Sequence, residues 1–148
     1  TRPLVVRLGG TDSLSGPGRA QRTSGRLTGK VETFGPPQLK VTARLRGGWS
    51  RLVAVLTAKP PGKPVIVISE GGINTSGLSG SRRLTINMID VATLIPRGSR
   101  LQLTLASSSL AQSPSNLLYL NFPMPAAARI SLGPARLVVP ILKAPVSR

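Results

Sequence analysis

The apolar residues of this chain stand in short runs in which every second side chain is apolar, and Gly or Pro separates the runs. The clearest run covers residues 39–46, where odd positions are apolar and even positions are Lys, Thr or Arg. Successive side chains of a strand point to opposite faces, so this period of two predicts strands with one buried face. No window of a dozen residues keeps the spacing of an amphipathic helix. The chain is therefore predicted to be all-β.

About ten short antiparallel strands are expected, each bounded by Gly, Pro or Ser. They cover residues 4–8, 30–34, 39–46, 51–58, 64–69, 84–88, 101–105, 117–122, 129–132 and 136–142. A short turn over 90–94 is the one helical candidate. Strands without crossover helices favour a sandwich or barrel. The side chains expected to face inward are Leu39, Val41, Ala43, Leu45, Leu84, Ile86, Leu101, Leu103 and Leu105.

Three polar stretches, rich in Gly or Ser, interrupt the strands and are predicted to be loops: residues 9–29, 71–81 and 107–116. The length of 148 residues suits one domain with a core that needs no disulfide or metal. We expect a loosely packed arm or a leading strand over residues 1–22. A single β-sandwich domain is expected over residues 23–148.

The chain contains no His and no Cys. A Ser-His-Asp triad, a cysteine nucleophile and metal sites built on imidazole or thiolate are therefore excluded within it. Its carboxylates could in principle form a two-carboxylate glycosidase site, but the excess of Arg favours ion pairing instead. These carboxylates are Asp12, Glu32, Glu70 and Asp90. We expect no catalytic residue, no cofactor and no metal in this chain.

The chain is strongly basic, with 20 Lys and Arg against 4 Asp and Glu, a net charge of +16. Such a charge can neutralise phosphates, but the basic residues are spread along the chain, and few aromatic residues are available as stacking platforms. The sequence therefore favours a solvated basic surface, or a face that docks on an acidic partner, over nucleic-acid binding.

The aromatic residues are candidates for such a docking face, because aromatic side chains are enriched at interfaces. The candidates are Trp49, Tyr119 and Phe122. Trp49 could instead stack on a sugar, but the only Trp of an all-β domain is more often an anchor in a core or an interface.

Nothing in the sequence indicates a membrane span or a signal peptide. The purely aliphatic runs reach four residues at most, and no basic stretch leads into an apolar run. The composition fits either a cytoplasmic or an extracytoplasmic protein.

Several segments, taken in order, resemble the C-terminal domain of the X-Pro dipeptidyl-peptidase and cocaine-esterase family of serine hydrolases. Residues 23–45, TSGRLTGKVETFGPPQLKVTARL, resemble its entry strand, G-P-P turn and alternating strand. Residues 84–109 resemble its strand, connector and P-x-G-x-R-L turn, and residues 128–142 resemble its final hairpin. The chain has Ser99 where members of the family often carry His. It also has Gly-Pro-Ala at 133–135 in place of His-Pro-Ser.

This resemblance implies a jelly-roll β-sandwich, similar to galactose-binding-like carbohydrate-binding modules, packed against an α/β-hydrolase catalytic domain of the same parent protein. The implied role is non-catalytic: to cover that domain and help shape its substrate cleft. The Ser, Asp and His of the family lie in the hydrolase domain, so no catalytic residue is carried over to this chain. The alternative is an independent β-sandwich module that binds carbohydrate or another polyanion.

Overall fold

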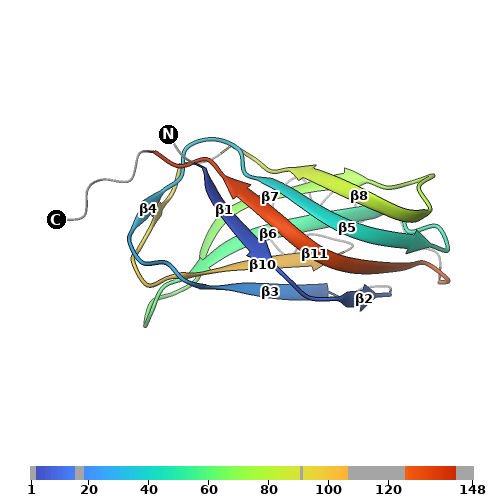
Figure 1. The fold of residues 1–148 in the computed structure, drawn as a ribbon, viewed down its shortest axis with the longest axis horizontal. Helices are drawn as coiled ribbons and strands as arrows, with labels where there is room; N and C mark the ends of the chain where they lie inside the picture. Colours follow the sequence, from blue (N-terminus) through green and yellow to red (C-terminus); the bar gives the residue numbers. More distant parts are fainter. Residues whose placement is uncertain (1–2, 16–18, 91, 107–125, 143–148) are drawn as a thin grey trace.

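The computed structural model describes residues 3–15, 19–90, 92–106 and 126–142, and Figure 1 shows their fold. The described residues form two antiparallel sheets that pack face to face, with a two-stranded pair at one end. The described residues contain no helix, and therefore no helix that could cross a membrane. The prediction of an all-β sandwich is confirmed.

The first sheet has five strands. Four lie in the order β1-β11-β5-β8, and β2 pairs with β11 beyond the end of β1. These strands are β1 (Leu4–Leu8), β2 (Asp12–Leu14), β5 (Gln38–Arg46), β8 (Gly80–Asn87) and β11 (Arg129–Val139).

The second sheet has four strands in the order β3-β10-β6-β7. They are β3 (Arg19–Arg26), β6 (Arg51–Lys59), β7 (Ile66–Asn74) and β10 (Arg100–Ala106). The two-stranded pair consists of β4 (Val31–Glu32) and β9 (Leu94–Ile95).

The topology is that of a jelly roll. Leaving aside the short strands β2, β4 and β9, eight main strands remain, and the first pairs with the last, β1 with β11. Moving inward along the chain, β3 pairs with β10, β5 with β8, and β6 with β7. This nested antiparallel pairing rolls one long hairpin into two sheets, which is the jelly-roll arrangement.

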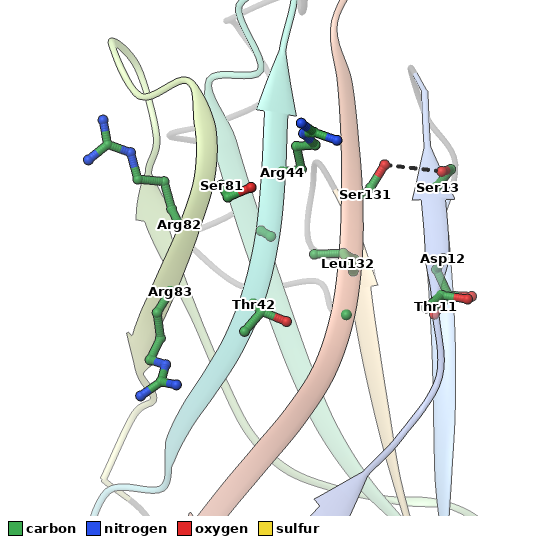
Figure 2. Close-up of a pocket in the computed structure, with 12 residues that line it drawn as sticks. Thr11, Asp12, Ser13, Thr42, Arg44, Ser81, Arg82, Arg83, Ser131 and Leu132 are labelled. Carbon is green, nitrogen blue, oxygen red and sulfur yellow. Dashed lines mark hydrogen bonds between the residues drawn. The ribbon is translucent and has the colours of Figure 1, made fainter.

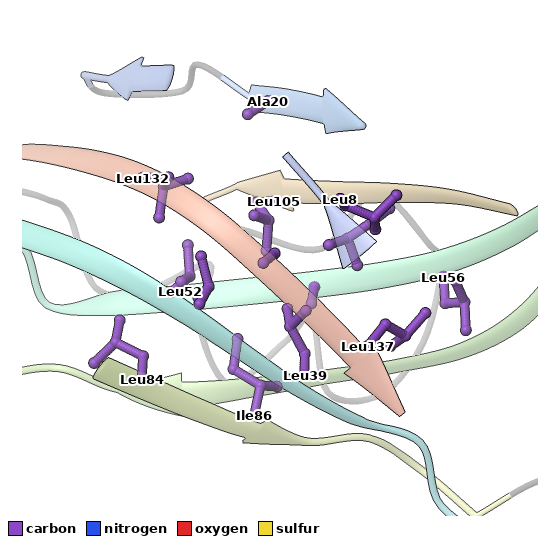
Figure 3. Packing of buried hydrophobic residues seen from close by; sticks show 14 of the residues in the cluster. Leu8, Ala20, Leu39, Leu52, Leu56, Leu84, Ile86, Leu105, Leu132 and Leu137 are labelled. Carbon is purple, nitrogen blue, oxygen red and sulfur yellow. The ribbon is translucent and has the colours of Figure 1, made fainter. Parts of the chain in front are cut away.

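The core lies between the two sheets and is built by the alternation seen in the sequence (Figure 3). In β5 the odd positions 39–45 are buried and the even positions 40–46 are exposed. All nine side chains expected to face inward are buried, with at most 5% of their surface exposed. A slip of one residue in any of these strands would turn its apolar set to water, so the pattern also fixes the register.

The C-terminal strand differs from the prediction, which divided it into two strands at residues 129–132 and 136–142. The structure has one strand, β11, with a β-bulge: Leu132 faces Ala43 and Ala135 faces Val41 on β5. One extra residue in β11 changes which positions point inward, from even before the bulge to odd after it. Proline is tolerated at such bulges, and Pro134 lies in this one.

Two predicted loops are largely strands. Residues 9–29 hold β2 and β3, and Leu14 and Ala20 belong to the core. Together with β1, they place residues 4–8, 12–14 and 19–22 in strands of the two sheets. Residues 71–81 hold the end of β7 and the start of β8. The polar composition misled the prediction because outward positions of a strand tolerate Ser, Gly and Arg as readily as a loop does.

Three further expectations concern the turn at 90–94, the loop at 107–116 and the strand at 117–122. The helical turn expected over 90–94 is not found among the described residues there, because Leu94 begins strand β9. The strand expected at 117–122 and the loop at 107–116 lie outside the described residues.

The β7–β8 edge of the sandwich is closed by backbone contacts. The amide nitrogen of Ile89 donates to the carbonyl oxygen of Glu70 at 2.8 Å. A side chain at Gly71 would place its Cβ 2.7 Å from the carbonyl oxygen of Asn87, so only glycine allows the two sheets to approach this closely here.

A substitution of Leu103 tests whether the inward-facing side chains form the core. Leu103 lies in the middle of β10 and has 0% of its surface exposed. We expect Leu103→Ala to lower the free energy of unfolding by about 2–5 kcal/mol, because it removes buried methyl groups and leaves a cavity. Val5→Ala, at a position of β1 that is 40% exposed, is the control, and should change stability by no more than about 0.5 kcal/mol. Urea denaturation of both variants measures the difference; equal effects would contradict this core.

Candidate functional site

A hollow lies on the outer face of the five-stranded sheet, over β2, β11, β5 and β8 (Figure 2). It is a shallow depression of about 670 Å³. Arginines and hydroxyl-bearing side chains form most of its lining: Thr11, Ser13, Thr42, Arg44, Ser81, Arg82, Arg83 and Ser131. Figure 2 shows Arg44 near Ser131, between β5 and β11.

A second hollow of about 360 Å³ lies beside the first on the same face. It shares Thr42 and Arg83 with the first hollow and adds Arg7, Lys40 and Arg136. Because Thr42 and Arg83 face each other across β5 and β8, the two hollows meet at this cross-strand pair. They form one shallow groove along the sheet, which we call the outer groove.

The sheet register gathers basic side chains around the outer groove. Arg7 of β1 faces Arg136 of β11, and Arg136 faces Lys40 of β5. Neighbouring strands lie about 4.8 Å apart, so these three cations form one dense row across three strands. We define the basic face by seven exposed cations of these strands: Arg7, Lys40, Arg44, Arg46, Arg83, Arg129 and Arg136.

The carboxylate that lines the outer groove, Asp12, is already paired. Its Oδ2 accepts hydrogen bonds from Nε and Nη2 of Arg22 at 3.1 Å and 3.0 Å. Among the described residues, no ion pair is found for the seven cations of the basic face. The basic face therefore has no anion of its own to balance it.

Arg22 is a buried arginine on β3, with 5% of its surface exposed. Besides Asp12, its Nη1 donates to the carbonyl oxygens of Leu8, at 3.1 Å, and of Gly133. Its Nη2 donates to the carbonyl oxygen of Leu132 at 3.2 Å. A guanidinium has five N–H donors, and these contacts use every one of them. Arg22 thus links the four-stranded sheet to three strands of the other sheet.

The carbonyl groups that Arg22 binds are free because the ladder is interrupted at this point. β1 pairs with β11 only from Ala135 onward, and β2 pairs with it only up to Leu132. The bulge of β11 lies in the gap between them. A Cβ on Gly133 would lie against the hydroxyl oxygen of Thr42, so a larger residue there would require the Thr42 side chain to rotate.

The structure does not place Trp49 on the expected docking face. It is 0% exposed and belongs to the core cluster, so it is a core anchor and not part of the surface. Its Nε1 has no hydrogen-bond acceptor among the described residues. Its carbonyl oxygen accepts a hydrogen bond from the hydroxyl of Thr75 at 2.8 Å. Tyr119 and Phe122 lie outside the described residues.

The other carboxylates do not assemble an acid–base pair in the outer groove. Its first hollow holds one carboxylate, that of Asp12, and its second holds none. Glu32 is exposed on β4, Glu70 is buried on β7 and Asp90 is exposed after β8. Within the described ranges, no three acidic side chains gather as metal ligands would. The groove can bind anions, but it offers no pair of carboxylates for glycosidic hydrolysis.

The two outer faces of the sandwich are unlike. On the outer face of the four-stranded sheet, β6 contributes Val53 and Val55, which are buried, and β10 contributes Thr104 and Ala106, also buried. Next to them, Val67 of the edge strand β7 is 57% exposed. The burial of these outward positions could not be predicted from the sequence, because residues 51–56 are buried throughout, which hides the period of two.

The sequence matches no family model and no curated protein. Solved structures do match the fold. A CocE/NonD family hydrolase from Staphylococcus aureus aligns with a TM-score of 0.65 and 10% identity, over 95% of this chain and 36% of its own. An alpha-amino acid ester hydrolase aligns with a TM-score of 0.62 and 13% identity, over 84% of this chain and 25% of its own. The chain has the fold of one part of these hydrolases.

A third match is an aminopeptidase from the marine sediment archaeon Thaumarchaeota archaeon, with a TM-score of 0.61 and 13% identity, over 84% of this chain and 26% of its own. The chain therefore spans only about a quarter to a third of the length of these enzymes. The resemblance expected from the sequence is confirmed at the level of fold, in hydrolases of the expected kind.

Arg22 is the position to test at this site. We expect Arg22→Met to lower the free energy of unfolding by about 3–5 kcal/mol, because Asp12 and three backbone carbonyls lose their donor in a buried setting. Arg26→Met, at an exposed position of the same strand, is the matched control and should change stability by no more than about 0.5 kcal/mol. Thermal or urea unfolding compares the two. A fully stable Arg22→Met variant would show that the sheets do not depend on this contact.

Proposed function

We propose that the chain is a non-catalytic C-terminal accessory domain of an α/β-hydrolase of the X-Pro dipeptidyl-peptidase type, which packs on the catalytic domain and helps to shape its substrate cleft. One observation carries the proposal. Nearly the whole chain aligns with a CocE/NonD family hydrolase, yet it spans only 36% of that enzyme. A fold that recurs as a minor part of several hydrolases favours an accessory role.

The residue content of the chain agrees with a non-catalytic role. Without His and Cys, it has no imidazole to activate a serine and no thiol nucleophile. The catalytic Ser, Asp and His of the proposed parent enzyme would come from its hydrolase domain. The substrate of that enzyme, whether a peptide, an ester or an amide, depends on that domain as well.

The outer face of the four-stranded sheet is the better candidate for contact with the catalytic domain. Its edge carries Val67, whose side chain is 57% exposed, and packing between domains favours the removal of such apolar surface from water. The basic face is the poorer candidate, because cations buried without partners are costly to desolvate. Tyr119 and Phe122 stay proposed interface residues.

The alternative, an independent carbohydrate-binding module, has less support. Neutral sugars are commonly held by exposed aromatic platforms, and Trp49, the Trp that could have served, lies in the core. Charge, and not stacking, dominates the outer groove.

Coexpression with the α/β-hydrolase domain of the parent protein tests the proposal. We expect a stable complex in which hydrolysis of X-Pro or ester substrates belongs to the hydrolase domain alone. Val67→Glu should weaken the complex by about 10-fold or more, since it places a charge in an apolar contact. Val5→Glu, at a 40% exposed position on the opposite face, is the matched control and should leave the complex intact.

Two results would contradict this proposal. One is the absence of any complex between the wild-type chain and the hydrolase domain. The other is turnover by the purified chain, lost on changing Glu32, Glu70 or Asp90, which would indicate a carboxylate-based enzyme.

A further inference from the structure

We propose that the outer groove binds an acidic polysaccharide, a polymer whose sugar units carry sulfate or carboxylate groups beside their hydroxyls. This inference concerns the basic face and is independent of the accessory role, which we assign to the opposite face of the sandwich.

The row of three cations on this face gains no stability from its own register. Arg7, Arg136 and Lys40 face one another across neighbouring strands, and like charges directly opposite in a sheet repel. Asp12, the carboxylate of the groove, is occupied by Arg22. An anion that lies across this row would relieve the repulsion and gain several charge-assisted contacts at once. The row is therefore suited to a ligand with closely spaced negative charges.

The shape of the site favours a linear ligand. The two hollows, of about 670 Å³ and about 360 Å³, meet at Thr42 and Arg83. Lys40, Thr42 and Arg44 follow one another along the exposed side of β5, with about 7 Å between successive positions. A polymer laid along β5 would meet a cation, a hydroxyl and a second cation in turn.

The lining favours a polysaccharide over other polyanions. Hydroxyl groups of Thr42, Ser81 and Ser131 lie among the arginines, and they can bond to sugar hydroxyls while the arginines bind the acidic groups. None of the described residues that line the groove is aromatic, so the bases of a single-stranded nucleic acid would find no stacking platform. An acidic peptide would offer carboxylates but few partners for the hydroxyl groups.

The experiment uses the full 148-residue chain, fluorescently labelled, at 150 mM salt. The acidic polysaccharide probes are heparin, which is sulfated, and polygalacturonate, which is carboxylated. Neutral dextran, duplex DNA and polyglutamate serve as comparison ligands. The test variant is Lys40→Gln/Arg44→Gln/Arg83→Gln. The matched control is Lys59→Gln/Arg19→Gln/Arg26→Gln, which removes the same three charges from exposed positions of the four-stranded sheet. Thermal unfolding checks that both variants fold.

We expect at least one acidic polysaccharide to bind more tightly than DNA and polyglutamate, and dextran not to bind. The test variant should lose affinity by about 10-fold or more, and the control by about threefold at most. The salt dependence of binding should become shallower in the test variant only. Equal losses in the two variants would overturn the proposal, since net charge alone would then explain binding.

Binding of DNA or polyglutamate at least as tight as that of both polysaccharides would also overturn it, in favour of a nucleic acid or an acidic protein. So would failure of both polysaccharides to bind. No hydrolase domain takes part in these measurements, so their outcome is separate from that of the accessory-domain test.

Discussion

One buried guanidinium links the two sheets of this sandwich. Arg22 reaches from β3 to Asp12 and to backbone carbonyls of β1 and β11, and so joins the two sheets at the edge where the ladder is interrupted. A buried cation is tolerated only when its donors are satisfied, and here all are. The same contact neutralises Asp12, so no ion-pair partner for the basic face is found in the part of the chain that the structure describes.

The two outer faces differ in chemistry, and we propose different roles for them. The four-stranded sheet exposes the apolar side chain of Val67 at its edge, and this edge is our proposed contact with a second protein domain. The face of the five-stranded sheet carries a row of cations and a shallow groove lined by hydroxyls, which suits an anionic polymer. An accessory domain with two such faces could hold its hydrolase on one side and a polyanion on the other.

Much of the fold could be predicted from the sequence because alternation is a local property. The period of two in residues 39–46 reveals a half-buried strand whatever it pairs with, and the absence of His and Cys excludes whole classes of chemistry in any fold. Prediction failed where alternation was hidden. Residues 19–26 carry few apolar side chains, and in residues 51–56 both faces are buried. The bulge at 133–134 changes which positions of β11 point inward, and one strand was therefore predicted as two.

The sequence by itself determined that the chain is all-β, which side chains of its clearly alternating strands face the core, and that its charge is strongly positive. The tertiary structure alone decided where that charge gathers, because Arg7, Lys40 and Arg136 are far apart in the chain and meet only through strand register. It also decided that Trp49 is a core residue and that Arg22 is buried. Such contacts depend on which strands become neighbours, and pairing between distant segments leaves no periodic trace in either of them.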